Sequence, residues 1–125
     1  IVKSDWSYVL STNQKANVLD DATVGKQLIY TPRLTHQHLA MITYKKLGIG
    51  INYTYTGFRF ITSDNSHFID DYGLLSAFAS FGYTYRKINT YLKLQVNNVL
   101  QTSYQVLPAR PMPLQNWQVS LGINF

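Results

Sequence analysis

The chain has 125 residues, no cysteine and a net charge of +5 at pH 7. The length fits one ordinary domain, and the lack of cysteine excludes disulfides and thiolate metal sites. The Lys and Arg residues are scattered, which argues against nucleic acid as a partner. No apolar run approaches the ~18 residues of a transmembrane helix. The chain starts at Ile1 with no leader segment, so we expect a mature or cut N-terminus.

Alternation of apolar and polar residues predicts three strands in the first half of the chain. Near the start, Trp6, Tyr8 and Leu10 alternate with Ser and Val. Residues 35–45 form a less regular strand, which the pattern does not orient. Residues 47–55 alternate cleanly, with Leu, Ile and Tyr on one face and Gly, Asn and Thr on the other. Such alternation is typical of a strand with one apolar face.

Three further strands are predicted in the second half. Residues 75–85 place Leu, Ala, Phe and Tyr on one face and, apart from Phe78, only Ser, Gly and Thr on the other. Residues 91–98 and 117–125 alternate in the same way. The last segment, WQVSLGINF, matches the ~9–11 residues that a tilted strand needs to cross a bilayer.

Short and long connections alternate between these strands. The short turns are at residues 45–46 and 86–89, and the long polar connections are at 14–33, 61–73 and 99–116. Single-chain outer-membrane barrels have short periplasmic turns and long extracellular loops in this rhythm. The sequence therefore predicts an all-β fold, a segment of an antiparallel transmembrane β-barrel whose last strand ends on the periplasmic side.

Aromatic residues lie toward the ends of the predicted strands, at Tyr53, Tyr83, Tyr85 and Trp117. Membrane barrels carry aromatic girdles at this level, because amphipathic rings prefer the headgroup zone. Soluble lipocalin-like barrels and sandwiches also show alternating strands. The smallest membrane barrels use about eight strands, so six would need further strands from the same or another chain.

The residues that carry chemistry form no enzyme motif. His36 and His38 would share one strand face, but no third metal ligand is near them in sequence. Acid pairs at 20–21 and 70–71 lie in predicted loops, where solvated carboxylates are ordinary and Ca²⁺ binding is the alternative. No phosphate-binding glycine loop or nucleophile elbow is present. We expect no enzyme activity, no metal and no cofactor.

Ligand contacts are expected in the long connections, because loops carry recognition on a rigid scaffold. By residue type, the candidates are Phe68, Tyr72, Tyr104 and Arg110. Polar strand residues would line the lumen of a barrel or touch a plug inside it; these are Asn52, Thr54, Lys93, Gln95 and Asn97.

Three segments resemble the C-terminal barrel strands of TonB-dependent outer-membrane receptors. They are GKQLIYTPR at 25–33, LQVNNVL at 94–100 followed by Tyr104-Gln105-Val106, and RPMPLQNWQVSLGINF at 110–125. Their order and spacing match the family, and the cobalamin and siderophore receptors are the most similar group. Residues 114–115 are Leu-Gln, where such receptors often carry Gly-Arg.

This resemblance implies a barrel of about 22 strands plugged by an N-terminal domain. Residues 1–125 would form its C-terminal part, without the plug or the segment that contacts TonB. The implied function is TonB-driven import of a scarce nutrient, such as a siderophore-iron or cobalamin complex, across the outer membrane of a Gram-negative bacterium. The implied partners are the rest of the barrel and the plug, TonB, the lipid bilayer and, as a further candidate, a surface lipoprotein.

The end of the chain resembles an outer-membrane insertion signal. A terminal aromatic, Phe125, closes an alternating strand that contains Gly122, and such an ending implies recognition by the barrel-assembly machinery. The alternative function is a small or oligomeric structural or binding barrel of the outer membrane without TonB-driven transport. A soluble ligand-binding barrel is a third possibility.

Overall fold

A computed structural model describes residues 1–16 and 19–124. These residues form one antiparallel sheet in the order β1-β2-β3-β6-β7-β8, together with a small two-stranded hairpin, β4-β5. The bounds are β1 Val2–Tyr8, β2 Leu34–Tyr44, β3 Leu47–Thr56, β4 Arg59–Phe60, β5 Phe68–Ile69, β6 Tyr72–Tyr85, β7 Ile88–Asn97 and β8 Asn116–Asn124. The part of the chain that the structure describes contains no helix long and apolar enough to span a membrane.

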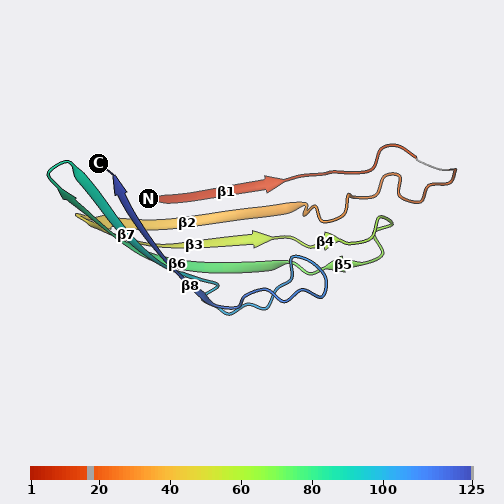
Figure 1. Cartoon of the computed structure of the whole chain (residues 1–125). Helices are drawn as coiled ribbons and strands as arrows, with labels where there is room; N and C mark the ends of the chain where they lie inside the picture. Colours follow the sequence, from red (N-terminus) through yellow and green to blue (C-terminus); the bar gives the residue numbers. More distant parts are fainter. Residues whose placement is uncertain (17–18, 125) are drawn as a thin grey trace.

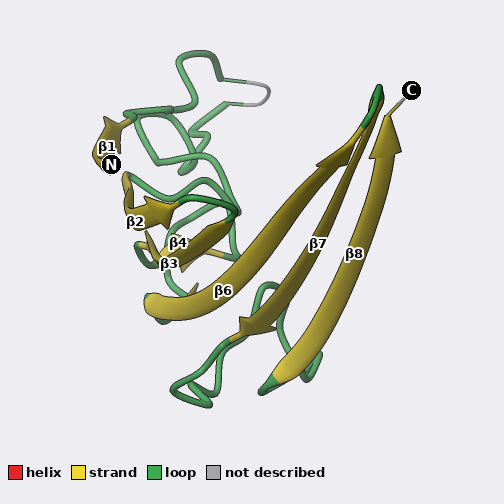
Figure 2. Cartoon of the chain, turned by 90° about the vertical axis from the view of Figure 1, so that its left-hand side faces the viewer, coloured by secondary structure: helices red, strands yellow, loops and turns green. Residues whose placement is uncertain are grey.

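The six-stranded sheet is not closed into a barrel. Its outer strands, β1 and β8, pair only with β2 and β7 respectively. Figure 2 shows the sheet curved into an open trough, with β1 and β8 on opposite sides. The predicted antiparallel all-β architecture is therefore confirmed, and both edge strands keep a free edge.

Residues opposite one another in the ladders share a face, so the alternation of each strand adds up across the sheet. One row runs through Ile42, Ile49, Ala79, Leu94 and Val119, which are paired successively from β2 to β8. The parallel rows on this side are also mainly aliphatic or aromatic. We call this side the apolar face.

The other side of the sheet, the polar face, carries mainly small and polar residues, with exceptions that include Leu39, Met41 and Phe78. Its adjacent row runs through Thr43, Gly48, Ser80, Lys93 and Ser120. These residues alternate with those of the apolar face, and a slip of one residue in any ladder would exchange the two sides. The sequence pattern thus determines both strand formation and the side to which each residue belongs.

Burial in this sheet is the reverse of that in a water-soluble domain. On the apolar face, Ile42 is 78% exposed, Val119 67% and Leu121 70%. On the polar face, Gly48 and Gly50 are buried and Gln95 is half-buried. Among the described residues, Ile69 is the only buried hydrophobic side chain. The apolar face must therefore be covered by something other than the described chain.

The two ends of the sheet differ. Two-residue turns, Lys45-Lys46 and Arg86-Lys87, join β2 to β3 and β6 to β7, and we call that end the turn end. The long connections 9–33, 57–71 and 98–115 lie at the opposite end, the loop end. The predicted alternation of short and long connections is confirmed.

Several predicted boundaries were wrong. β1 covers Val2–Tyr8, and Leu10 lies outside it, because the chain leaves the ladder after Val9 donates its amide to Arg33. The predicted loop at 61–73 contains β5 and the start of β6. The predicted turn at 86–89 is shorter, since Ile88 already pairs with Tyr85. Phe125 lies outside the described residues.

Candidate functional site

The long connections at the loop end are tied to one another by hydrogen bonds. Asn65 Oδ1 accepts from the Gln27 amide at 2.8 Å, and Asn65 Nδ2 donates to the Gln27 carbonyl at 2.9 Å. Gln27 is 2% exposed, and its side chain accepts from Arg33 Nε. The amide of Tyr30 donates to the Phe60 carbonyl at 2.8 Å. The 9–33 connection therefore packs on the β4-β5 hairpin in a defined position.

Arg59 links the β4-β5 hairpin to the 98–115 connection. It is 5% exposed, and its Nη2 donates to the Gln105 carbonyl at 2.8 Å. Its guanidinium carbon lies 5.3 Å from the centre of the Tyr72 ring, within the range of cation–π attraction. Its Nε has no partner. Arg59 thus ties the 98–115 connection to the β4-β5 hairpin and to Tyr72 at the start of β6.

Asn98 sets the start of the 98–115 connection. It is 3% exposed and has a positive φ of 50°, a conformation that Asn tolerates better than most residues. Its side chain accepts from the Thr102 amide and donates to the Thr102 carbonyl, both at 2.9 Å. The Val99 amide then donates to the Leu75 carbonyl at 2.7 Å. These bonds fold the loop back over the sheet.

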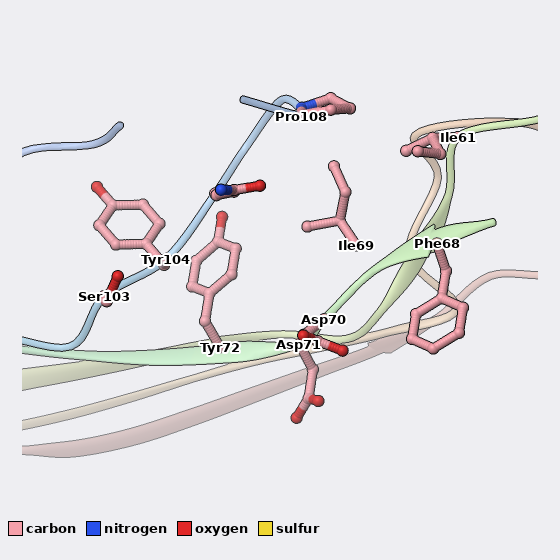
Figure 3. A pocket seen from close by; sticks show the side chains of 10 residues that line it. Ile61, Phe68, Ile69, Asp70, Asp71, Tyr72, Ser103, Tyr104 and Pro108 are labelled. Carbon is pink, nitrogen blue, oxygen red and sulfur yellow. The ribbon is translucent and has the colours of Figure 1, made fainter. Parts of the chain in front are cut away.

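A pocket of about 330 Å³ opens between β5, the start of β6 and the 98–115 connection. Three of the four predicted ligand residues line it: Phe68, Tyr72 and Tyr104. The Tyr72 and Tyr104 rings lie 4.8 Å apart, with Phe68 toward the other end (Figure 3). Arg110 does not line this pocket and is exposed. The structure brings the three aromatic candidates together and leaves the arginine apart.

Sequence reasoning missed Arg59, although its guanidinium lies over the ring of Tyr72 and it is hydrogen-bonded to the Gln105 carbonyl. Its signal in the sequence is weak, since a single arginine between Phe58 and Phe60 reads as an ordinary loop residue. The contact with Gln105, which is 46 positions away, depends on the fold. The residues next to Arg59 in the sequence do not predict this contact.

The acidic residues do not form a shared cation site. Asp71 accepts from the Tyr55 hydroxyl at 2.8 Å, and Asp21 Oδ1 accepts from the amide and hydroxyl of Thr23. Hydrogen bonds from Thr62 and then from Ser66 lower the pKa of Asp64 to about 2. Within residues 1–16 and 19–124, no group of three or more His, Cys, Asp or Glu side chains could hold a metal ion.

The two histidines belong to an aromatic cluster on the apolar face near the loop end. The His36 ring stacks between Trp6, at 4.3 Å, and Tyr55, at 4.8 Å, and the His38 ring stacks with Tyr53 at 6.4 Å. The two histidines share one strand face, as predicted, and they lie there in a patch of stacked rings. Figure 1 shows that β1, β2 and β3, which supply these rings, run side by side.

The aromatic residues expected at strand ends fall into two bands on the apolar face. Tyr53 and Trp117 lie toward the loop end of β3 and β8, whereas Tyr83 and Tyr85 lie at the turn end of β6. Aliphatic rows separate the two bands. Gly122, in contrast, lies on the polar face, where it pairs with Tyr91.

Comparison with protein-family models and with curated proteins finds no match for this chain. The arrangement of side chains is therefore the basis for a functional proposal. It consists of an exposed apolar face with two aromatic bands, an opposite face with polar side chains, and packed loops with an aromatic pocket at one end.

Proposed function

We propose that this chain is a C-terminal segment of a transmembrane β-barrel, belonging to a TonB-dependent receptor of the outer membrane of a Gram-negative bacterium. The observation that carries the proposal is the reversed burial of the two sheet faces. A lipid bilayer covers an exposed apolar face with hydrocarbon, while polar residues line a lumen.

The dimensions of the sheet support insertion in a bilayer. In the six-stranded sheet, the five strands other than β1 have 9 to 14 residues, enough for the ~9–11 residues of a tilted crossing. The two aromatic bands would lie at the two headgroup zones. The turn end would then be periplasmic and the loop end extracellular.

Closure of the barrel requires partner strands. An unpaired backbone group in hydrocarbon costs several kcal/mol, so the free edges of β1 and β8 must each find a strand. In the proposed receptor the rest of the barrel supplies both. The polar side chains of Asn52, Lys93 and Gln95 would face the plug or the water around it.

The proposed substrate is a scarce nutrient, such as a siderophore-iron or cobalamin complex, that binds at the loop end. The aromatic pocket of Phe68, Tyr72 and Tyr104 supports this role, because flat rings contact large ligands at little entropic cost. TonB would supply the energy and the barrel-assembly machinery would insert the chain. A surface lipoprotein remains a candidate partner, and no enzymatic role is proposed.

Nutrient uptake by the intact protein tests the proposal. Cells lacking the protein should fail to grow when iron or cobalamin is supplied only as the complex that the protein imports. Growth should return with the intact gene but not in cells without TonB. Uptake that is independent of TonB would refute the transport role while leaving the membrane fold in place.

The free edges also support a second candidate, an oligomeric outer-membrane barrel in which β1 of one copy pairs with β8 of the next. Such a barrel would need no plug and no TonB. Native mass spectrometry in detergent separates the two possibilities. A closed stoichiometry of identical chains favours the oligomer, whereas these strands within one larger plugged polypeptide favour the receptor.

A further inference from the structure

Every residue of the two turns at the turn end is basic. Lys45 and Lys46 join β2 to β3, and Arg86 and Lys87 join β6 to β7. All four side chains are exposed. The loop end is different, since its three long connections carry five Lys or Arg residues and five Asp residues, and their charges balance. Positive charge is therefore concentrated on one end of the sheet.

Three of the four cations lie over tyrosines of the apolar face. Lys46 Nζ is 4.2 Å from the centre of the Tyr83 ring, and Lys45 Nζ is 5.3 Å from that of Tyr44. The Arg86 guanidinium carbon is 5.4 Å from the centre of the Tyr85 ring. All three tyrosines alternate in phase with the aliphatic rows. The charges are thus held at the rim of the apolar face, away from the polar face.

The first residue of each turn, Lys45 or Arg86, has a backbone conformation that Lys and Arg rarely adopt. Lys45 and Arg86 both have φ of 53°, in the left-handed region where a side chain with a Cβ is strained. Asn or Gly fits the first position of a two-residue hairpin turn with less strain. Two separate turns nevertheless carry a basic residue at this position.

We propose that the turn end binds anionic phospholipids, with their headgroup phosphates between the basic turns and their acyl chains along the apolar face. Charge complementarity and the contacts with the tyrosine rings favour a lipid over a soluble polyanion. A soluble ligand would not need cations at the rim of a lipid-covered surface. The inference rests on the bilayer placement in the proposed function and is independent of transport.

The test compares two lipids on the intact protein. The protein, purified in a non-ionic detergent, is incubated with an equimolar mixture of phosphatidylglycerol and phosphatidylcholine, and native mass spectrometry counts the retained lipids. The variant K45N/R86N removes two cations and relieves the left-handed strain, so it should fold. We expect its preference for phosphatidylglycerol to fall about fivefold for each cation removed.

Two matched variants sharpen the result. K15N/K26N removes two lysines from the loop end and should leave the preference unchanged, and the charge-preserving K45R/R86K should keep it. Unchanged preference in K45N/R86N, or equal loss in K15N/K26N, would overturn the inference. Binding of soluble peptidoglycan fragments without lipid preference would also overturn it. A protein that enters neither micelles nor bilayers would instead refute the membrane proposal itself.

Discussion

Tyr91 on β7 lies between two glycines, and its ring covers only one of them. Gly82 of β6 and Gly122 of β8 are its direct partners in the two flanking ladders. A Cβ on Gly122 would collide with the Tyr91 ring, whereas a Cβ on Gly82 would meet nothing within 4 Å. An aromatic ring that covers a glycine on the neighbouring strand stabilises the pairing. Gly122 therefore has a packing role that does not depend on an assembly signal.

This asymmetry predicts non-additive effects of alanine at the two glycines. G122A should lower the free energy of unfolding by about 1 kcal/mol, because the Tyr91 ring must turn toward Gly82. G82A should be nearly neutral. In the double variant G82A/G122A, the Tyr91 ring has no open glycine to turn toward, so the loss of unfolding free energy should exceed the sum of the two single losses. Urea unfolding of the intact protein in lipid vesicles measures all three, and strict additivity would contradict the proposed movement of the ring.

Arg59 and Arg110 form a matched pair for testing the loop-end site. R59A removes a buried charged donor to the Gln105 carbonyl and should cost about 2 kcal/mol, freeing the 98–115 connection from the hairpin. R110A changes an exposed side chain and should stay within about 0.5 kcal/mol of the parent protein. Limited proteolysis should cleave residues 98–115 faster in R59A only. Equal cleavage of both variants would show that Arg59 does not hold this loop.

The two sheet faces should respond oppositely to a new charge. V119K places a cation in the middle of the apolar face and should cost about 2–4 kcal/mol in a bilayer. Q118K, on the neighbouring position of β8, places the same charge on the polar face and should be tolerated. Unfolding free energies in phospholipid vesicles give the comparison. Similar values for the two variants would contradict a lipid-covered apolar face.

Asp64 should titrate at unusually low pH. Hydrogen bonds from Thr62 and Ser66 lower its pKa from 3.8 to about 2, so they favour the charged, folded turn. Their contribution is fully present above pH 3.8 and is lost as the pH falls through about 2. An NMR titration of the Asp64 carboxyl carbon measures the midpoint. T62V removes the first of these bonds and should raise it, and an unchanged midpoint would assign the shift to Ser66 alone.

The strands and their faces could be predicted from sequence because alternation depends only on neighbours along the chain. Leu94 and Val119 were assigned to apolar strand faces from local pattern, and the ladders pair them directly. Strand boundaries were harder to predict where the ladder extends beyond the alternating segment, as at Val2 of β1 and Tyr72 of β6. The polar sequence of residues 61–73 concealed a hairpin that Phe58, Phe60 and Phe68 hold by ring contacts of 5.5 and 5.9 Å.

The loop-end site was predictable only in part. Tyr72 and Tyr104 could be named by residue type, since aromatic residues in long loops are common recognition groups. That their rings meet depends on Arg59, Gln105 and Asn98 folding the 98–115 connection over β6. Such contacts join residues far apart in sequence and leave no periodic signal. For the same reason, the separation of Arg110 from the pocket could not be foreseen.

The alternation of apolar and polar residues disfavours some shifts in strand register but not others. A slip of one residue exchanges the faces, whereas a slip of two preserves them. The two-residue turns prevent such slips between β2 and β3 and between β6 and β7. The three remaining ladders are joined by long connections and depend on loop packing such as the Gln27–Asn65 pair. In the proposed barrel, the stagger that sets the shear, and with it the width, could therefore change by insertions or deletions in those connections alone.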